Sequence, residues 1–161
     1  MAFNVCMEIF LRMKTLKQIN EKDVEQAKKK NATLHNVYFV IKDFKPHGKL
    51  KAASAEDSKE RLLILNSTQN FVRLFQHSKD TRQACLSMNY KSSLCRCMAM
   101  YHAYVLDDKL NLNVYFRSMN YNKNIEFDIQ TFDMFLTKLS KDINIKKGEM
   151  IFIINNLHPK K

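Results

Sequence analysis

The sequence is poor in the residues that interrupt secondary structure, with only two Gly and two Pro among 161 residues, and it has no Trp. Element boundaries must therefore be found from hydrophobic spacing more than from turn residues. No apolar stretch approaches the ~20 residues that a membrane helix needs, so we expect no membrane-spanning segment. The apolar N-terminus, residues 1–11, lacks a basic flank and a small-residue cleavage site, which argues against a signal peptide.

Cysteine is also sparse. The four Cys have no regular disulfide spacing and occur with nine Met, which favours a reducing compartment, and we expect a cytoplasmic protein. Cys95, Cys97 and His102 together suggest zinc. A structural zinc site normally needs four ligands, often as two close pairs, and the second pair is missing. We therefore expect no metal.

Acidic residues are outnumbered, since Lys and Arg total 27 against 16 Asp and Glu, for a formal charge of +11. This excess favours polyanionic partners such as nucleic acid or nucleotides. It is equally typical of a protein from an AT-rich genome, because AT-rich codons encode Lys and Asn. The basic residues are scattered and form no aromatic-basic repeat, so dedicated nucleic-acid binding stays an alternative.

Hydrophobic spacing predicts one domain of mixed α and β structure, hence the α+β class. Helices are expected at residues 13–30, 68–76 and 128–140. Strands are expected at residues 36–44, 83–89, 98–106, 110–118 and 150–154, with a loop at 45–60. Asp107–Lys109 reads as a hairpin turn. Strict alternation in the strand at 98–106 would place Cys97 and Tyr101 on one face and Met98 and His102 on the other.

Four segments in the second half of the chain carry a resemblance. The segment from Lys79 reads KDTRQACLS, that from Cys97 reads CMAMYHAYV, that from Val114 reads VYFRSMN, and that from Lys146 reads KKGEMIFIINNLH. In this order they resemble the thymidylate synthase and deoxycytidylate hydroxymethylase family. The resemblance implies a thymidylate synthase-like mixed sheet with packed helices, shortened at both ends. Residues 67–161 would be its core, and residues 1–66 a divergent N-terminal part of the same domain.

The resemblance implies two residues at the pyrimidine ring. Cys97 falls at the position of the nucleophile, whose thiolate adds to C6 of the ring. Asp128 lies eleven residues after Arg117, the spacing of the residue that reads the pyrimidine edge. In this, the sequence resembles the hydroxymethylases that act on deoxycytidylate, which carry Asp at this position where the deoxyuridylate enzymes carry Asn. A carboxylate accepts hydrogen bonds and so suits the N4 amine of cytosine.

Four further residues would bind the phosphate and the sugar. Arg117 and Ser118 fall at the phosphate site, where a planar guanidinium and a hydroxyl donor suit phosphate oxygens. Arg82 falls at an arginine that crosses a dimer interface to the partner's phosphate, so the resemblance implies a homodimer. His158 falls at a position that contacts the sugar hydroxyl.

The chain departs from the family at several of these motifs. Gln83 stands in place of a second arginine, Met98 in place of a histidine, and Phe116 in place of a glutamine. The sequence ends just after His158, without the family's C-terminal folate-closing segment. Methylene transfer needs bound folate, an ordered water network and a lid. A thiol alone supplies none of these.

Three hypotheses follow. The first is a truncated, non-catalytic protein of viral or phage origin, in the host cytoplasm, that binds a pyrimidine nucleoside monophosphate or a protein partner and needs no cofactor. The second is a minimal dCMP or dUMP hydroxymethylase or methyltransferase that uses Cys97 and tetrahydrofolate. The third is a basic nucleic-acid-binding or structural protein on the same fold.

Overall fold

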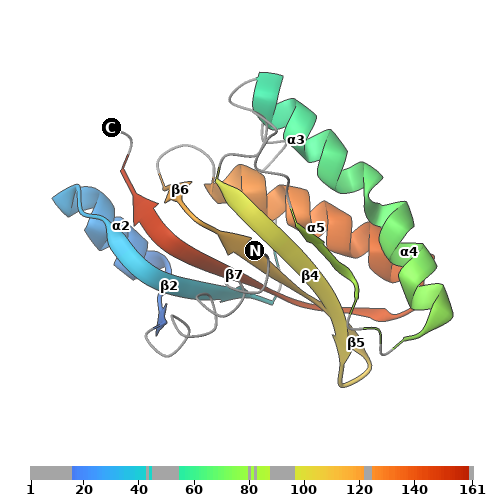
Figure 1. Cartoon of the computed structure of the whole chain (residues 1–161). Coiled ribbons are helices and arrows are strands. Elements are labelled where there is room, and N and C mark those ends of the chain that lie inside the picture. Colours follow the sequence, from blue (N-terminus) through green and yellow to red (C-terminus); the bar gives the residue numbers. More distant parts are fainter. Residues whose placement is uncertain are drawn as a thin grey trace, which may run out of the picture.

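The computed structural model describes residues 16–42, 44, 55–79, 81, 83–87, 97–121 and 125–159. It has the predicted α+β architecture, with one mixed seven-stranded sheet and helices packed on it (Figure 1). The described helices are α2 (Glu21–Lys30), α3 (Ala55–Asn66), α4 (Thr68–His77) and α5 (Ile125–Asp142). The strands are β1 (Lys17–Gln18), β2 (Leu34–Ile41), β3 (Cys85–Ser87), β4 (Met98–Leu106), β5 (Lys109–Phe116), β6 (Met119–Asn120) and β7 (Lys146–His158). Within the described residues, none of the helices is long and apolar enough to cross a membrane.

The strand order is β1-β2-β7-β5-β4-β3, and the short β6 also pairs with β7. β7 runs parallel to β5 and β6 and antiparallel to β2. In the β5–β7 ladder Phe116 lies opposite Ile154, so both strands reach their carboxyl ends at the same edge of the sheet. The residues that follow Phe116 therefore lie beside the last residues of β7.

β4 and β5 form the predicted hairpin. Leu106 pairs with Lys109, and the two intervening residues, Asp107 and Asp108, have φ angles of 51° and 56°. Two successive left-handed residues are typical of a type I′ turn, whose twist matches that of the paired strands. The hairpin holds the start of β4 next to the end of β5.

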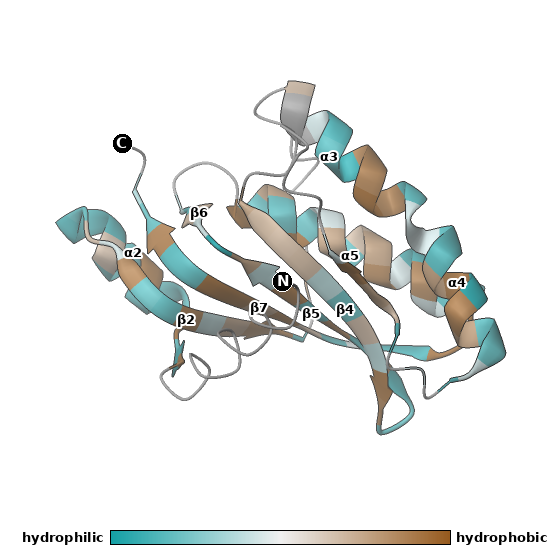
Figure 2. Ribbon diagram, in the orientation of Figure 1, coloured by the Kyte–Doolittle hydropathy of each residue, from teal (hydrophilic) through white to brown (hydrophobic). Residues whose placement is uncertain are grey.

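The core lies between the sheet and the helices. Phe132 of α5 packs edge-to-face against Tyr101, Phe116 and Phe152 of three adjacent strands. α3 and α4 lie along α5 (Figure 1), and Phe71 of α4 stacks on Tyr101. Figure 2 shows hydrophobic residues concentrated on the central strands, while the helices carry hydrophobic and hydrophilic bands. This pattern is expected for helices that bury one face.

The predicted alternation along β4 is wrong at Met98. Met98 pairs with Phe116, whereas Met100 pairs with Tyr115, so the register shifts by one residue between them. Residues directly opposite each other share a face of the sheet. Met98 therefore lies on the helix-covered face with Phe116 and is only 1% exposed. A β-bulge of this kind re-aims the side chains at the start of the strand.

Several element boundaries also differ from the predictions. The predicted helix at 13–30 begins only at Glu21, because Asn20 caps it. The Asn20 side chain accepts hydrogen bonds from the backbone N–H groups of Lys22 and Asp23, and the Asp23 carboxylate accepts one from the Asn20 backbone N–H. Lys17–Gln18 instead form β1. The predicted loop at 45–60 includes the first turns of α3, and its residues 45–54 lie outside the described residues.

Candidate functional site

The edge where β5 and β7 end brings together four of the six predicted site residues. Ser118 follows β5 and His158 ends β7, and the Ser118 Oγ lies 2.8 Å from the His158 Nε2. The Arg117 backbone N–H donates to the Cys97 carbonyl oxygen at 2.8 Å, which places Cys97 beside Arg117. The parallel β5–β7 pair and the β4–β5 hairpin together create this cluster from residues up to 61 positions apart in sequence.

The hydrogen bonds of His158 define its tautomer. Its Nδ1 lies 2.6 Å from the Pro159 carbonyl oxygen, which can only accept, so Nδ1 carries the hydrogen. In a neutral imidazole the Nε2 is then an acceptor, and the Ser118 hydroxyl donates to it. His158 is also held by its backbone, since its carbonyl oxygen accepts from the Tyr121 N–H at 3.1 Å. The pair is thus positioned before any ligand is bound.

Two polar residues that sequence reasoning missed support the same edge. The Asn156 side-chain amide reaches the Arg117 carbonyl oxygen at 3.5 Å, and the Asn156 Oδ1 accepts from the His35 Nδ1 at 2.8 Å. The pair Asn155–Asn156 interrupts the apolar run of β7, and that interruption could have identified Asn156. No sequence feature points to His35, because only the β2–β7 pairing brings it here.

Cys97 and Arg117 are both exposed, so a ligand in solvent can reach them. Within the part of the chain that is described, Cys97 and Cys85 form no disulfide. An exposed thiol is chemically accessible, whereas a buried cysteine is usually inert. The cluster therefore offers a thiol, a guanidinium, a hydroxyl and an imidazole at one edge.

Asp128 lies in the helix layer, on α5. It lies in the first turn of α5, four residues before Phe132, and so shares a face of the helix with it. Phe132 contacts Phe116, the residue that precedes Arg117. Asp128 is therefore on the sheet-facing side of α5, one turn closer to its N-terminus. A carboxylate is also favoured there by the helix dipole.

Two of the substituted family positions, Met98 and Phe116, are buried. Met98 is 1% exposed and Phe116 is 5% exposed. Phe116 stacks on Phe152 at 5.8 Å between ring centroids and meets Phe132 at 6.4 Å. Where the resembled family carries polar side chains, this chain has hydrocarbon packed into its core.

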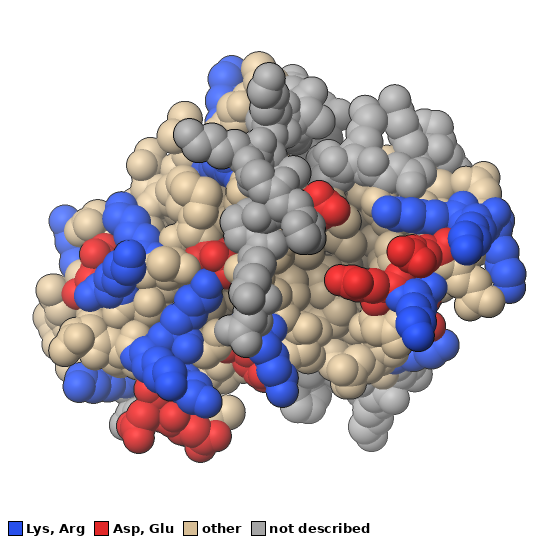
Figure 3. Space-filling model, turned by 180° about the vertical axis from the view of Figure 1, so that it is seen from behind, with Lys and Arg blue, Asp and Glu red and all other residues tan. Residues whose placement is uncertain are grey.

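Three further expectations concern Arg82, metal binding and nucleic-acid binding. Arg82 falls outside the described residues, and its neighbour Gln83 is exposed. The described ranges contain no group of three or more His, Cys, Asp or Glu side chains that could hold a metal ion. On the face in Figure 3, Lys and Arg gather in separate groups with acidic side chains among them. The Lys and Arg side chains described on that face form no continuous basic track for a nucleic-acid backbone.

The amino-acid sequence also matches a protein-family model. The model described as thymidylate synthase matches residues 14–159 of the 161-residue chain. The match includes residues 14–66, upstream of the four motifs that carry the resemblance, and so covers α2 and β2 as well.

Proposed function

The chain belongs to the thymidylate synthase family, and we propose that it binds a pyrimidine nucleoside monophosphate without catalysing methylene transfer. The observation that carries this proposal is the meeting of Cys97, Arg117, Ser118 and His158 at one edge of the sheet. These residue types match the parts of the ligand: a guanidinium and a hydroxyl for phosphate, an imidazole for the sugar, and a thiol at the base.

The proposed ligand is a cytidine nucleotide. Asp128 lies in the first turn of α5 and is an acceptor when ionised. Cytosine presents an N4 amine that donates, whereas uracil presents an O4 oxygen that only accepts. The site should therefore prefer dCMP over dUMP, since a carboxylate facing O4 would leave two acceptors unpaired.

Met98 and Phe116 support a binding role without turnover. A chain of ordered water molecules needs polar partners and room, and these two buried side chains offer neither. General acid–base steps in the resembled reaction depend on such a chain. Cys97 would then contact the bound base without completing a reaction on it.

A homodimer completes the proposed site. Arg82 would reach the phosphate bound by the partner subunit, which adds a second guanidinium to Arg117. Light scattering of the purified protein should give twice the mass of the chain. A monomer would remove Arg82 from the site, and binding would then depend on Arg117 and Ser118 alone.

Calorimetric titration of dCMP, dUMP and dTMP tests the binding proposal. We expect dCMP to bind, and Arg117→Ala to weaken it about 10- to 100-fold, because a charge-assisted hydrogen bond contributes roughly 1.5–3 kcal/mol. Arg73→Ala is the matched control, since Arg73 is an exposed arginine on α4. No binding of any of the three nucleotides to the wild-type protein would overturn the proposal.

Release of tritium from C5-labelled dCMP or dUMP, with and without tetrahydrofolate, tests the absence of catalysis. Nucleophilic addition at C6 labilises the C5 hydrogen, so release reports the first covalent step. We expect no release above that of Cys97→Ser. Release that depends on Cys97 would instead establish the minimal hydroxymethylase or methyltransferase hypothesis.

A further inference from the structure

Arg61 of α3 clamps the first turns of α5. Its Nη2 donates to the Gln130 Oε1 at 2.7 Å, and its Nε donates to the Thr131 Oγ1 at 3.0 Å. Its guanidinium also lies 4.2 Å from the centre of the Phe127 ring, within the range of a cation–π contact. One side chain thus contacts three residues of α5 from a helix more than sixty residues upstream.

The residue between these contacts is Asp128. Burial lowers the pKa of Arg61 from its ordinary value, and the negative charge of Asp128 raises it. Arginine remains protonated in proteins, so the guanidinium is a permanent cation that attracts this carboxylate.

The contacts also limit how α5 can rotate. Thr131 is itself fixed, because its hydroxyl donates to the Phe127 carbonyl oxygen at 2.8 Å while it accepts from Arg61. With Phe127, Gln130 and Thr131 all held by one planar group, the first turns of α5 have one orientation relative to α3. The direction of the Asp128 side chain follows from that orientation.

We propose that Arg61 is a specificity-determining residue of the nucleotide site, which acts by holding the first turns of α5, and with them the Asp128 carboxylate, in the orientation that suits the amine of cytosine. This inference rests on the proposed function. Arg61 does not touch the ligand; it is a positioning residue. An ionised carboxylate only accepts, so it selects a base edge that donates. An Asp128 side chain rotated away from the base edge would lose this selectivity against the O4 of uracil.

The test compares the ratio of dUMP to dCMP dissociation constants in four proteins: wild type, Arg61→Met, Arg61→Lys and Asp128→Asn. We expect a wild-type ratio of about 10 to 100, in keeping with roughly 1–3 kcal/mol per base-edge contact. Arg61→Met keeps an apolar stem over Phe127 but removes the charge, and its ratio should fall to within about threefold of unity. Arg61→Lys keeps the charge and should retain a preference for dCMP, and Asp128→Asn should favour dUMP.

Deoxyribose 5-phosphate separates this role from a general loss of structure. It lacks the base, so its affinity should change by less than about twofold in Arg61→Met if the phosphate end is intact. Arg73→Met serves as the control for removing an exposed arginine.

The outcomes distinguish the two proposals. A wild-type ratio that persists in Arg61→Met, while Asp128→Asn reverses it, overturns the role of Arg61 alone. Equal loss of affinity for dCMP, dUMP and deoxyribose 5-phosphate in Arg61→Met overturns it as well, since that result reports a structural role. A wild-type protein that binds no nucleotide removes the proposed function and this inference with it.

Discussion

Substitution of Gly148 by alanine tests the packing that holds β5 against β7. A Cβ atom at this position would lie 2.8 Å from the Asn111 Cγ and 3.0 Å from the Leu110 carbonyl oxygen, and closer still to the Asn111 Oδ1. The Asn111 side chain is 6% exposed and bridges two strands: its Oδ1 accepts from the Glu149 N–H at 2.9 Å, and its Nδ2 donates to the Lys109 carbonyl oxygen at 3.0 Å. The new methyl group must therefore displace this amide.

The cost follows from those two hydrogen bonds. A buried polar group that loses its partner costs about 1–3 kcal/mol, so the loss of both hydrogen bonds of Asn111 should lower the free energy of unfolding by about 2–6 kcal/mol. For a chain of this size each kcal/mol corresponds to about 2–4 °C in Tm, which gives a decrease of about 4–24 °C.

Urea and thermal unfolding of wild type, Gly148→Ala, Asn111→Ala and the double variant measure this effect. Both single changes disrupt the same hydrogen bonds, and Asn111→Ala also removes most of the clash. The double variant should therefore lose less stability than the sum of the two, by about 0.5–3 kcal/mol. Lys146→Ala, an exposed change on β7, should stay within about 0.5 kcal/mol of wild type. Additive losses, or a neutral Gly148→Ala, would refute the reasoning.

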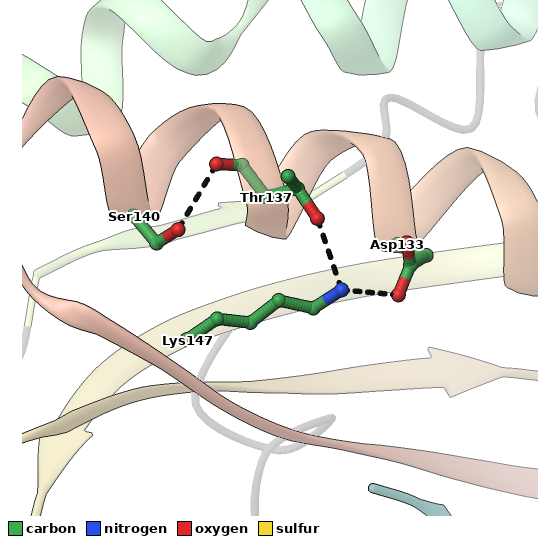
Figure 4. A network of polar contacts seen from close by, with 4 residues as sticks. All are labelled: Asp133, Thr137, Ser140 and Lys147. Atoms are coloured by element: carbon green, nitrogen blue, oxygen red, sulfur yellow. Dashed lines mark hydrogen bonds and ion pairs between the residues drawn. The ribbon is translucent and has the colours of Figure 1, made fainter. Parts of the chain in front are cut away.

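Two further predictions concern charged and titratable groups. Lys147 of β7 contacts Asp133 and donates to the Thr137 Oγ1 at 2.9 Å (Figure 4). The Lys147 side chain is 29% exposed and the Asp133 side chain 18% exposed. Asp133→Ala leaves a half-buried cation and should cost about 1–3 kcal/mol by urea unfolding, more than Lys147→Met, which retains the apolar stem; equal losses would contradict this. Burial lowers the pKa of His102 from its ordinary 6.5, and among the described residues its Nε2 is buried without a hydrogen-bond partner. Below about pH 7 the unfolded chain therefore binds a proton more readily than the folded one, and the free energy of unfolding decreases as the pH is lowered. His102→Leu should reduce this dependence of stability on pH between pH 7 and 5. The same slope in both proteins would argue against it.

Local patterns predicted the elements whose neighbours in sequence are also their neighbours in space. β4 spans Met98–Leu106, as the run of aromatic and apolar residues indicates, and the Asp107–Asp108 turn closes the hairpin. The amphipathic spacing at residues 128–140 identified most of α5, although the helix begins at Ile125. In these segments the interactions that stabilise the element lie within it or across one turn.

The errors occur where distant segments decide the structure. The start of α3 lies in a stretch of small and polar residues that resembles a loop, yet Arg61 and Ile64 of this helix find partners in α5 and the core. The apolar pattern of β7 marked only residues 150–154, but the strand extends over Lys146–His158 because β2, β5 and β6 all pair with it. The bulge at Met98 depends on the register with β5, which no single segment encodes.

The order and spacing of short motifs were enough to predict the family, the α+β class and the residue types of the candidate site. Which side chains share that site depends instead on pairing and packing between distant segments. The parallel pairing of β5 and β7 brings Ser118 to His158, and the packing of α3 on α5 brings Arg61 to Gln130 and Thr131. Such contacts form when apolar faces far apart in the chain are buried against each other. The hydrophobic effect that drives this burial is non-directional, so a local motif does not predict which segments will meet.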